Sequence, residues 1–168
     1  MGYGGGISGN VLPGWFGWAT DNFTWQINAG NGIGRYLLDN TNGGLATNYV
    51  VQPGCPTPTP GCALAATSVN VQTIPAVGGV VGYLHWWTPN LRSTIAYGRS
   101  RYQVPSILVG PIESTVANKQ LQSASVNLIW GPVAFVDIGA EYYWGQREVV
   151  AGLFGTEQVL IGQFRLKF

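Results

Sequence analysis

The segment PVAFVDIGAEYYWG, residues 132–145, decides the fold class because its hydrophobicity alternates with a period of two. One face of an extended chain would hold Ala134, Val136, Ile138, Ala140, Tyr142 and Trp144. The other face would hold Asp137, Gly139, Glu141 and Tyr143, with Phe135 at its start. A helix would bring Asp137 and Glu141 together, but it would scatter the apolar residues around its circumference. The segment therefore predicts a β-strand with one apolar and one polar face.

The same alternation recurs along the chain and predicts about seven strands. It is clear at residues 22–30, where the apolar face holds Phe23, Trp25, Ile27 and Ala29. It is also clear at the C-terminus, where one face holds Leu160, Gly162, Phe164, Leu166 and Phe168. Weaker alternation predicts strands near residues 3–11, 78–87, 91–102 and 119–130. Most of these segments are close to the roughly 9–11 residues that a tilted membrane-spanning strand needs.

The composition indicates which environment these strands occupy. Charged residues make up 9% of the chain, against about 25% in an ordinary soluble domain, and aromatic residues make up 12%. No apolar run reaches the roughly 18 residues of a transmembrane helix. The eight basic residues are scattered, so the net charge of +1 gives no sign of nucleic-acid binding. This combination is typical of an outer-membrane β-barrel, whose strands alternate lipid-facing and lumen-facing residues.

The connections between the strands alternate in length. Short ones are expected at residues 19–22, 88–90 and 131–132, and long ones at 38–77, 103–117 and 148–158. Outer-membrane barrels have short periplasmic turns and long extracellular loops. We therefore expect one barrel domain over residues 1–168, in which residues 38–77 form a long extracellular loop. Tryptophans near the short turns, and Tyr142, Tyr143 and Trp144 at the opposite end of their strand, predict two interfacial aromatic girdles.

Strand direction bears on the extent of the barrel. If the last strand ends in the periplasm, the alternation makes the first strand run inward from the outside. A single-chain bacterial barrel has an even number of strands and starts in the periplasm. Either one strand has escaped the count, or the chain is the C-terminal portion of a longer protein. We expect the second, in an all-β, antiparallel, up-and-down barrel.

Several segments resemble a known family. They are DNFTWQ at 21–26, GNGIGRY at 30–36, GYLHWWTPNLRS at 82–93 and GAEYYWG at 139–145. The chain resembles the C-terminal half of the DcaP-like porins of the Gram-negative outer membrane. The resemblance implies a homotrimeric barrel of about twice this length that passes small anionic solutes such as dicarboxylates. The ending QFRLKF, with Phe164, Leu166 and Phe168 in alternation, resembles the signal read by the barrel-assembly machinery.

A porin acts through charges that line its lumen, so the sequence predicts no catalytic residue, cofactor or metal site. Strand parity places Arg92, Arg165, Lys167, Asp137 and Glu141 on the lumen side, since a mid-membrane charge facing lipid would cost roughly 2–4 kcal/mol. These groups would either select solutes or form a structural ladder of ion pairs. Arg35, Arg99 and Arg101 lie near the extracellular ends of their strands. They would form a basic mouth that steers anions, or lie at the rim beside lipopolysaccharide phosphates.

Three further residues are candidates for a role other than lining the lumen. Cys55 and Cys62 lie in a proline-rich segment, where a disulfide suits an oxidising compartment; free thiols or a weak metal pair are the alternatives. His85 is the only histidine. A lipid-cleaving barrel enzyme would pair it with a serine, but the local sequence places none beside it, so an interfacial histidine is expected.

Two function classes follow from this reading. The first is a passive diffusion channel for small hydrophilic solutes. The second is a small closed barrel that serves as an anchor or adhesin, with the Cys55–Cys62 loop as its binding surface. Small residues on the expected lumen side, such as Ala96, Ser123, Ser125 and Gly139, argue against a filled interior. We therefore favour the channel.

Overall fold

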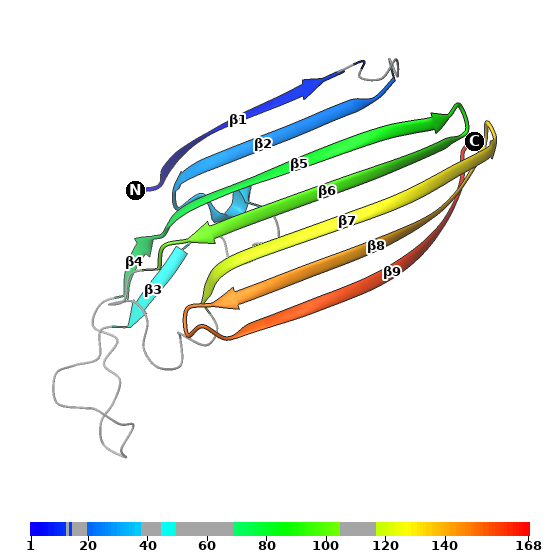
Figure 1. Cartoon of the computed structure of the whole chain (residues 1–168). Coiled ribbons are helices and arrows are strands. Elements are labelled where there is room, and N and C mark those ends of the chain that lie inside the picture. The colour runs from blue at the N-terminus through cyan, green and yellow to red at the C-terminus, as the bar shows by residue number, and fades with distance from the viewer. Residues whose placement is uncertain (13, 15–19, 38–44, 50–68, 105–116) are drawn as a thin grey trace, which may run out of the picture.

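The structure is a computed structural model that describes residues 1–12, 14, 20–37, 45–49, 69–104 and 117–168. At residues 35, 45–49 and 69–72 it describes the backbone alone. The main element is one antiparallel sheet in the order β1-β2-β5-β6-β7-β8-β9 (Figure 1). Its strands are β1 (Tyr3–Val11), β2 (Asn22–Asn31), β5 (Pro75–Thr88), β6 (Leu91–Tyr102), β7 (Asn118–Val133), β8 (Val136–Val149) and β9 (Phe154–Leu166). The seven predicted strands and the all-β, up-and-down fold class are confirmed.

The sheet has two chemically different faces, which follow from the pairing register. The face that we call the apolar face carries large hydrophobic side chains that are 42–78% exposed, such as Ile27, Val81, Ile95, Leu128, Tyr142, Leu160 and Phe164. The opposite, polar face carries the residues that alternate with them, including Thr94, Asn127 and Glu141, which neighbour one another across β6, β7 and β8. A broad exposed apolar surface of this kind fits contact with lipid.

The two ends of the sheet also differ (Figure 1). The turn end holds the tight turns after β5 and β7 and the C-terminus, and the loop end holds the connections 32–74 and 103–117. On the apolar face, Trp87 and Trp130 lie at the turn end, and Tyr142 and Trp144 lie toward the loop end, as expected of two girdles. The register places Trp86 and Tyr143 on the polar face, so neither belongs to a girdle that faces lipid.

The connection between β8 and β9 is far shorter than the expected 148–158 loop. Strand pairing continues to Glu148 opposite Phe154, so that only residues 150–153 lie between the strands. Gly152 has a φ of 81° and closes the turn, where its N–H donates to the carbonyl of Val149 at 2.9 Å. Glycine adopts this left-handed conformation without the steric cost that other residues incur.

The turn expected at residues 131–132 lies instead at Ala134 and Phe135. Strand β7 continues through Pro132 because the β7–β8 register shifts between Trp130 and Val133. A proline has no N–H to give to the ladder, and such an irregularity is one of the few places where a strand accepts it.

The β2–β5 connection contains structure of its own. A short hairpin pairs β3 (Leu45–Tyr49) with β4 (Val69–Thr73), and a 3-10 turn, η2, covers Gly34–Tyr36. The sheet's main apolar core lies beside this turn and consists of Ile33, Leu37, Ile74, Ala76 and Tyr102. In the part of the chain that the structure describes, no helix is long and apolar enough to cross a membrane.

Candidate functional site

The polar face holds an ion cluster at the turn end, centred on Asp137 of β8. The Asp137 carboxylate is 5% exposed. Its Oδ2 accepts from the Arg92 guanidinium at 3.1 Å and lies 2.9 Å from the Lys167 ammonium. The Arg92 guanidinium also lies 5.3 Å from the ring centroid of Trp86, within cation–π range. Two cations therefore share one carboxylate on the wall of the sheet.

Arg92 reaches this carboxylate across an intervening strand. Arg92 belongs to β6 and Asp137 to β8, with β7 between them, whereas Lys167 follows β9, the direct neighbour of β8. Gly131 of β7 makes the reach possible, because a Cβ there would lie 3.2 Å from Asp137 Oδ1. A side chain at this position would stand against the carboxylate.

The other charged residues predicted on the lumen side form no ion pair with the Asp137 cluster among the described residues. Arg165 is directly opposite Asp137 in the β8–β9 ladder, yet no carboxylate among the described residues lies within ion-pair distance of its guanidinium. Glu141 is opposite Asn127 and Ile161, farther along β8. At the loop end Arg147 donates to the Asn118 side chain at 2.6 Å. Glu157 lies on the polar face opposite Gly145.

Toward the loop end, residues 33–37 fold onto the polar face. The Asn28 side-chain amide donates to the Tyr36 carbonyl at 3.1 Å. Gly78 lies beneath this segment, since a Cβ there would come within 2.9 Å of Leu37 Cδ2. Gly30 is similarly covered: a Cβ there would meet the Cα of Gly4 and, at 2.8 Å, Ile33 Cγ2. We call residues 33–37 the inner strap; the side chain of Arg35 within it lies outside the described part.

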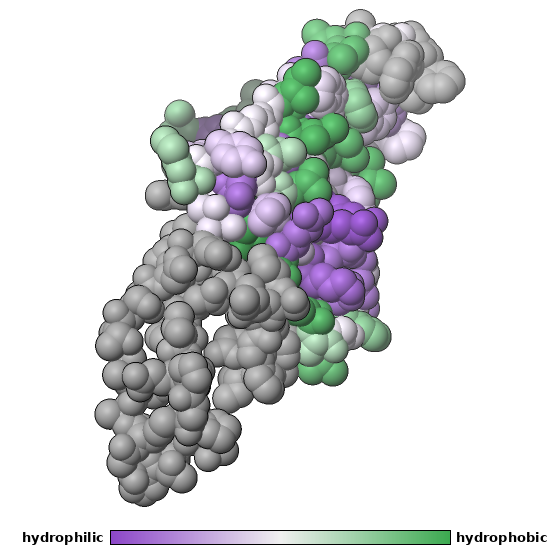
Figure 2. Space-filling model, turned by 90° about the vertical axis from the view of Figure 1, so that its left-hand side faces the viewer, coloured by the Kyte–Doolittle hydropathy of each residue, from purple (hydrophilic) through white to green (hydrophobic). Residues whose placement is uncertain are grey.

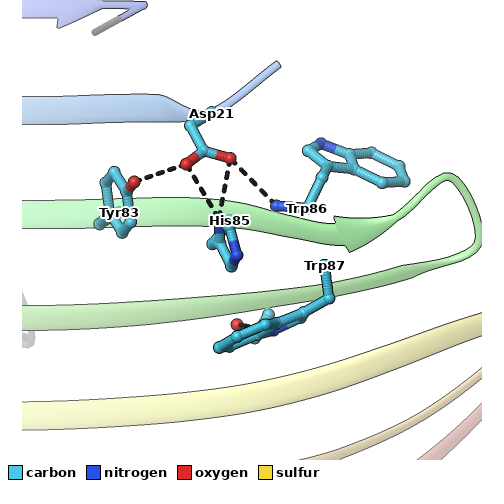
Figure 3. A network of polar contacts seen from close by, with 6 residues as sticks. Asp21, Tyr83, His85, Trp86 and Trp87 are labelled. Atoms are coloured by element: carbon cyan, nitrogen blue, oxygen red, sulfur yellow. Dashed lines mark hydrogen bonds and ion pairs between the residues drawn. The ribbon is translucent and has the colours of Figure 1, made fainter. Parts of the chain in front are cut away.

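A second polar network lies on the apolar face at the turn end (Figure 3). The fully buried Asp21 carboxylate accepts from the Tyr83 hydroxyl at 2.5 Å, from His85 Nδ1 at 2.9 Å and from the Trp86 backbone N–H at 3.1 Å. Because a carboxylate only accepts, His85 Nδ1 must carry a proton. The Trp87 ring meets the His85 ring edge-on, with 4.4 Å between centroids. The network ties the start of β2 to the end of β5.

The state of Asp21, in the turn before β2, follows from these contacts. Burial would raise the pKa of its carboxyl, but the hydrogen bonds from Tyr83, His85 and the Trp86 backbone and the charge of His85 outweigh it and hold the pKa below its usual value. Sequence reasoning missed this network. The β2–β5 register creates it by placing Asn22 opposite Leu84, and no local pattern signals that pairing.

The same network corrects the expectation that no serine lies beside His85. Ser93 is the direct cross-strand partner of His85 in the β5–β6 ladder. Its hydroxyl oxygen accepts from the Trp87 indole N–H at 3.0 Å. The serine thus fixes the Trp87 ring that covers His85.

Arg99 and Arg101 lie on the apolar face at the loop end. Each is exposed, and each donates to the Gln120 side-chain oxygen, at 2.7 Å from Arg99 and 2.9 Å from Arg101. They therefore lie outside the wall that holds Arg92 and Arg165. The structure does not bring the eight predicted charges into one site.

Comparison with known proteins assigns the fold to a family. The model of the DcaP outer membrane protein family matches residues 76–166, more than half of the chain. The chain belongs to the DcaP outer membrane protein family. The solved structure titled "Crystal structure of the outer membrane channel DcaP of Acinetobacter baumannii" matches with a TM-score of 0.69 and 21% identity, over 99% of this chain. The chain spans only 41% of that channel, and no curated protein matches it.

Membership of the DcaP family places the chain in the outer membrane, in a family of outer-membrane channels rather than of enzymes. The seven strands correspond to part of a porin barrel. In the C-terminal segment, Phe164 and Leu166 lie on the apolar face of β9, opposite Ile138 and Val136, and Phe168 follows the strand. Cys55 and Cys62 lie outside the described residues, so the disulfide stays a prediction.

Proposed function

We propose that this DcaP-family chain forms part of a porin that passes small, hydrophilic, anionic solutes such as dicarboxylates by diffusion. The observation that carries the proposal is the arrangement around Asp137. Arg92 and Lys167 both lie against its carboxylate, while Arg165 faces the same side with no described carboxylate within ion-pair distance. The wall near the turn end is thus positively charged, which raises the local concentration of anions.

The whole polar face supports a modest anion preference. By register and contacts, its cations are Arg92, Arg147, Arg165 and Lys167, and its carboxylates are Asp137, Glu141 and Glu157. Small residues such as Ala96, Ser123 and Gly139 line the middle of this face. They leave room for water in an open lumen. In the anchor or adhesin alternative, other side chains would have to fill this space.

We also propose that the apolar face of β1, β2 and β5 is the contact between subunits of a homotrimer. The Asp21, Tyr83 and His85 side chains lie on this face. The network buries a carboxylate on the side of the sheet that meets the membrane, where charged groups are costly, so a protein neighbour is a better environment for this region than lipid. A thiol cross-link between Ile27→Cys subunits, but not between Leu160→Cys subunits on the far side of the sheet, would support the trimer. The reverse pattern would contradict it.

Assembly is the third part of the proposal. Phe164, Leu166 and Phe168 alternate at the very end of the chain, and we propose that the barrel-assembly machinery recognises them. Phe168→Ala is expected to lower the amount of folded barrel in the outer membrane. Lys167→Ala in the same segment is expected to leave that amount unchanged.

The test of the function is ion selectivity in planar bilayers, measured on the full-length protein. In a potassium chloride gradient the reversal potential should show anion preference, and Arg165→Gln should reduce it. Glu157→Gln, which removes a carboxylate from the same strand and face, should increase it. Cation preference in the unmodified protein would contradict the proposal, and a lack of stepwise conductance would contradict any channel.

A further inference from the structure

The apolar face ends, toward the loop end, in a polar belt that the channel function does not use. We define the belt by Arg99 and Arg101 of β6 with Gln120 and Gln122 of β7, which pair with them in the ladder. Gln146 of β8 continues it, opposite Gln122. Figure 2, which views the molecule from the loop end, shows a hydrophilic patch beside the hydrophobic surface. By the strand register the belt lies on the same face as Ile95 and Val126, which is the apolar face that we assign to the membrane side.

Hydrogen bonds hold the belt in place. Gln120 Oε1 accepts from Arg99 Nη2 at 2.7 Å and from Arg101 Nε at 2.9 Å, which brings the two guanidinium groups together. Gln122 accepts from the Tyr97 hydroxyl at 3.2 Å and donates to Gln146 at 2.5 Å. A guanidinium group has five N–H donors, so most donors of both arginines remain available to a ligand.

The belt carries uncompensated positive charge. Of the ion pairs in the described part of the chain, none involves Arg99 or Arg101. Lys119 and Glu148 lie nearby and neutralise each other at 2.6 Å. Two close guanidinium groups with free N–H donors are suited to a phosphate group, which accepts paired hydrogen bonds.

The height of the belt identifies the source of the phosphate. Leu91, at the turn end of β6, lies eight residues before Arg99. At about 3.3 Å per residue and a tilt of about 40°, this places Arg99 about 20 Å above Leu91 along the membrane normal. The apolar band of an outer-membrane barrel is about 25 Å tall. Arg101, two residues farther along β6, lies about 25 Å above Leu91 by the same estimate. The two arginines therefore lie at the upper edge of the band, beyond the Tyr97, Tyr142 and Trp144 side chains, where the outer-leaflet headgroups begin.

We propose that Arg99 and Arg101 bind a phosphate group of the lipopolysaccharide lipid anchor, with Gln120 positioning both guanidinium groups. The site is separate from the solute path, because Arg99 and Arg101 face away from the polar wall. It borders the β1, β2 and β5 face that we assign to the subunit contact, because Arg99 lies opposite Gly79 and Arg101 opposite Val77 of β5.

The test measures lipid A binding by the full-length protein in detergent, by native mass spectrometry and by titration. Arg99→Gln combined with Arg101→Gln should weaken binding of bisphosphorylated lipid A roughly ten- to hundredfold, as expected for the loss of hydrogen bonds to a charged group. Arg147→Gln, which removes an arginine at a similar height on the polar face, should change the affinity less than about twofold.

A second measurement uses only the unmodified protein, so it does not depend on whether the variants fold. The unmodified protein should bind bisphosphorylated lipid A at least about tenfold more tightly than lipid A without phosphate groups. Equal affinity for the two lipids would overturn the proposal, as would unchanged binding by the double glutamine variant. If inorganic phosphate displaces lipid A when the two are present at equal concentration, the site binds anions without lipid specificity, and the proposal is wrong about the source of the phosphate. Cross-links from position 101 to a neighbouring subunit would show that protein occupies the belt instead.

Discussion

At the scale of single residues, Asp137 organises the charges of the polar wall. Its carboxylate lies against Arg92 and Lys167, and Gly131 leaves the space through which Arg92 reaches it. Strand parity predicted that these groups share a face, because alternation in an extended chain fixes the side of each residue. Which carboxylate pairs with which cation depends on register across three strands, and the sequence does not encode that locally.

The Asp137 cluster predicts a change in selectivity. Asp137→Asn removes the charge that neutralises Arg92 and Lys167, so both cations act on passing ions. The reversal potential in a salt gradient should move toward stronger anion preference. Glu141→Gln removes a carboxylate from the same face that has no ion pair among the described residues, so it should also move the reversal potential toward anion preference, but without freeing a paired cation. An Asp137→Asn channel with weaker anion preference would contradict the assignment.

The Asp21 network predicts a pH dependence of stability. The pKa of Asp21 is lower in the folded protein than its usual value, so its contribution is present above about pH 4 and is lost as the pH falls through the folded pKa. Denaturant midpoints of the folded barrel in detergent should fall more steeply as the pH is lowered below about 4 than those of Asp21→Asn. At neutral pH the Asp21→Asn variant should be less stable. Parallel curves for the two proteins would contradict this role.

At the scale of elements, the strands were predictable, as were the connections at 88–90 and 103–117, but other connections were not. The predicted strands at residues 3–11 and 91–102 match β1 and β6, since alternation marks a wall with one face in lipid. The expected 148–158 loop is instead a tight turn closed by Gly152. The inner strap has no period-two signal, because it packs through contacts with residues such as Gly78 that are distant in sequence.

The inner strap gives a prediction about packing. Gly30→Ala places a Cβ against the Cα of Gly4 and against Ile33, so the strap and β1 must shift, at a cost of about 1–3 kcal/mol. We expect a lower denaturant midpoint and an altered single-channel conductance. Gly162→Ala is the matched control in β9, because nothing lies within 4 Å of a Cβ there. Equal effects of the two variants would show that the strap does not pack against Gly30.

At the scale of the whole molecule, the sheet is open, since β1 and β9 are its outer strands. Both strands run from the loop end to the turn end, as an odd number of antiparallel strands requires. Closure by antiparallel pairs alone therefore needs an odd number of additional strands between β9 and β1. The 41% share of the DcaP channel fits a barrel of about sixteen strands, an even number as in other single-chain bacterial barrels.

The most direct test of the central claim, that the polar face lines a conducting pore, is thiol modification during single-channel recording. Cysteine is placed at Asn127 on the polar face, or at its neighbour Val126 on the apolar face, with Cys55 and Cys62 replaced by serine. A charged, water-soluble thiol reagent should change the conductance of Asn127→Cys channels and leave Val126→Cys channels unchanged. The account would be contradicted if the reagent changed the conductance of Val126→Cys channels alone. It would also be contradicted if the channels failed to conduct before any reagent was added.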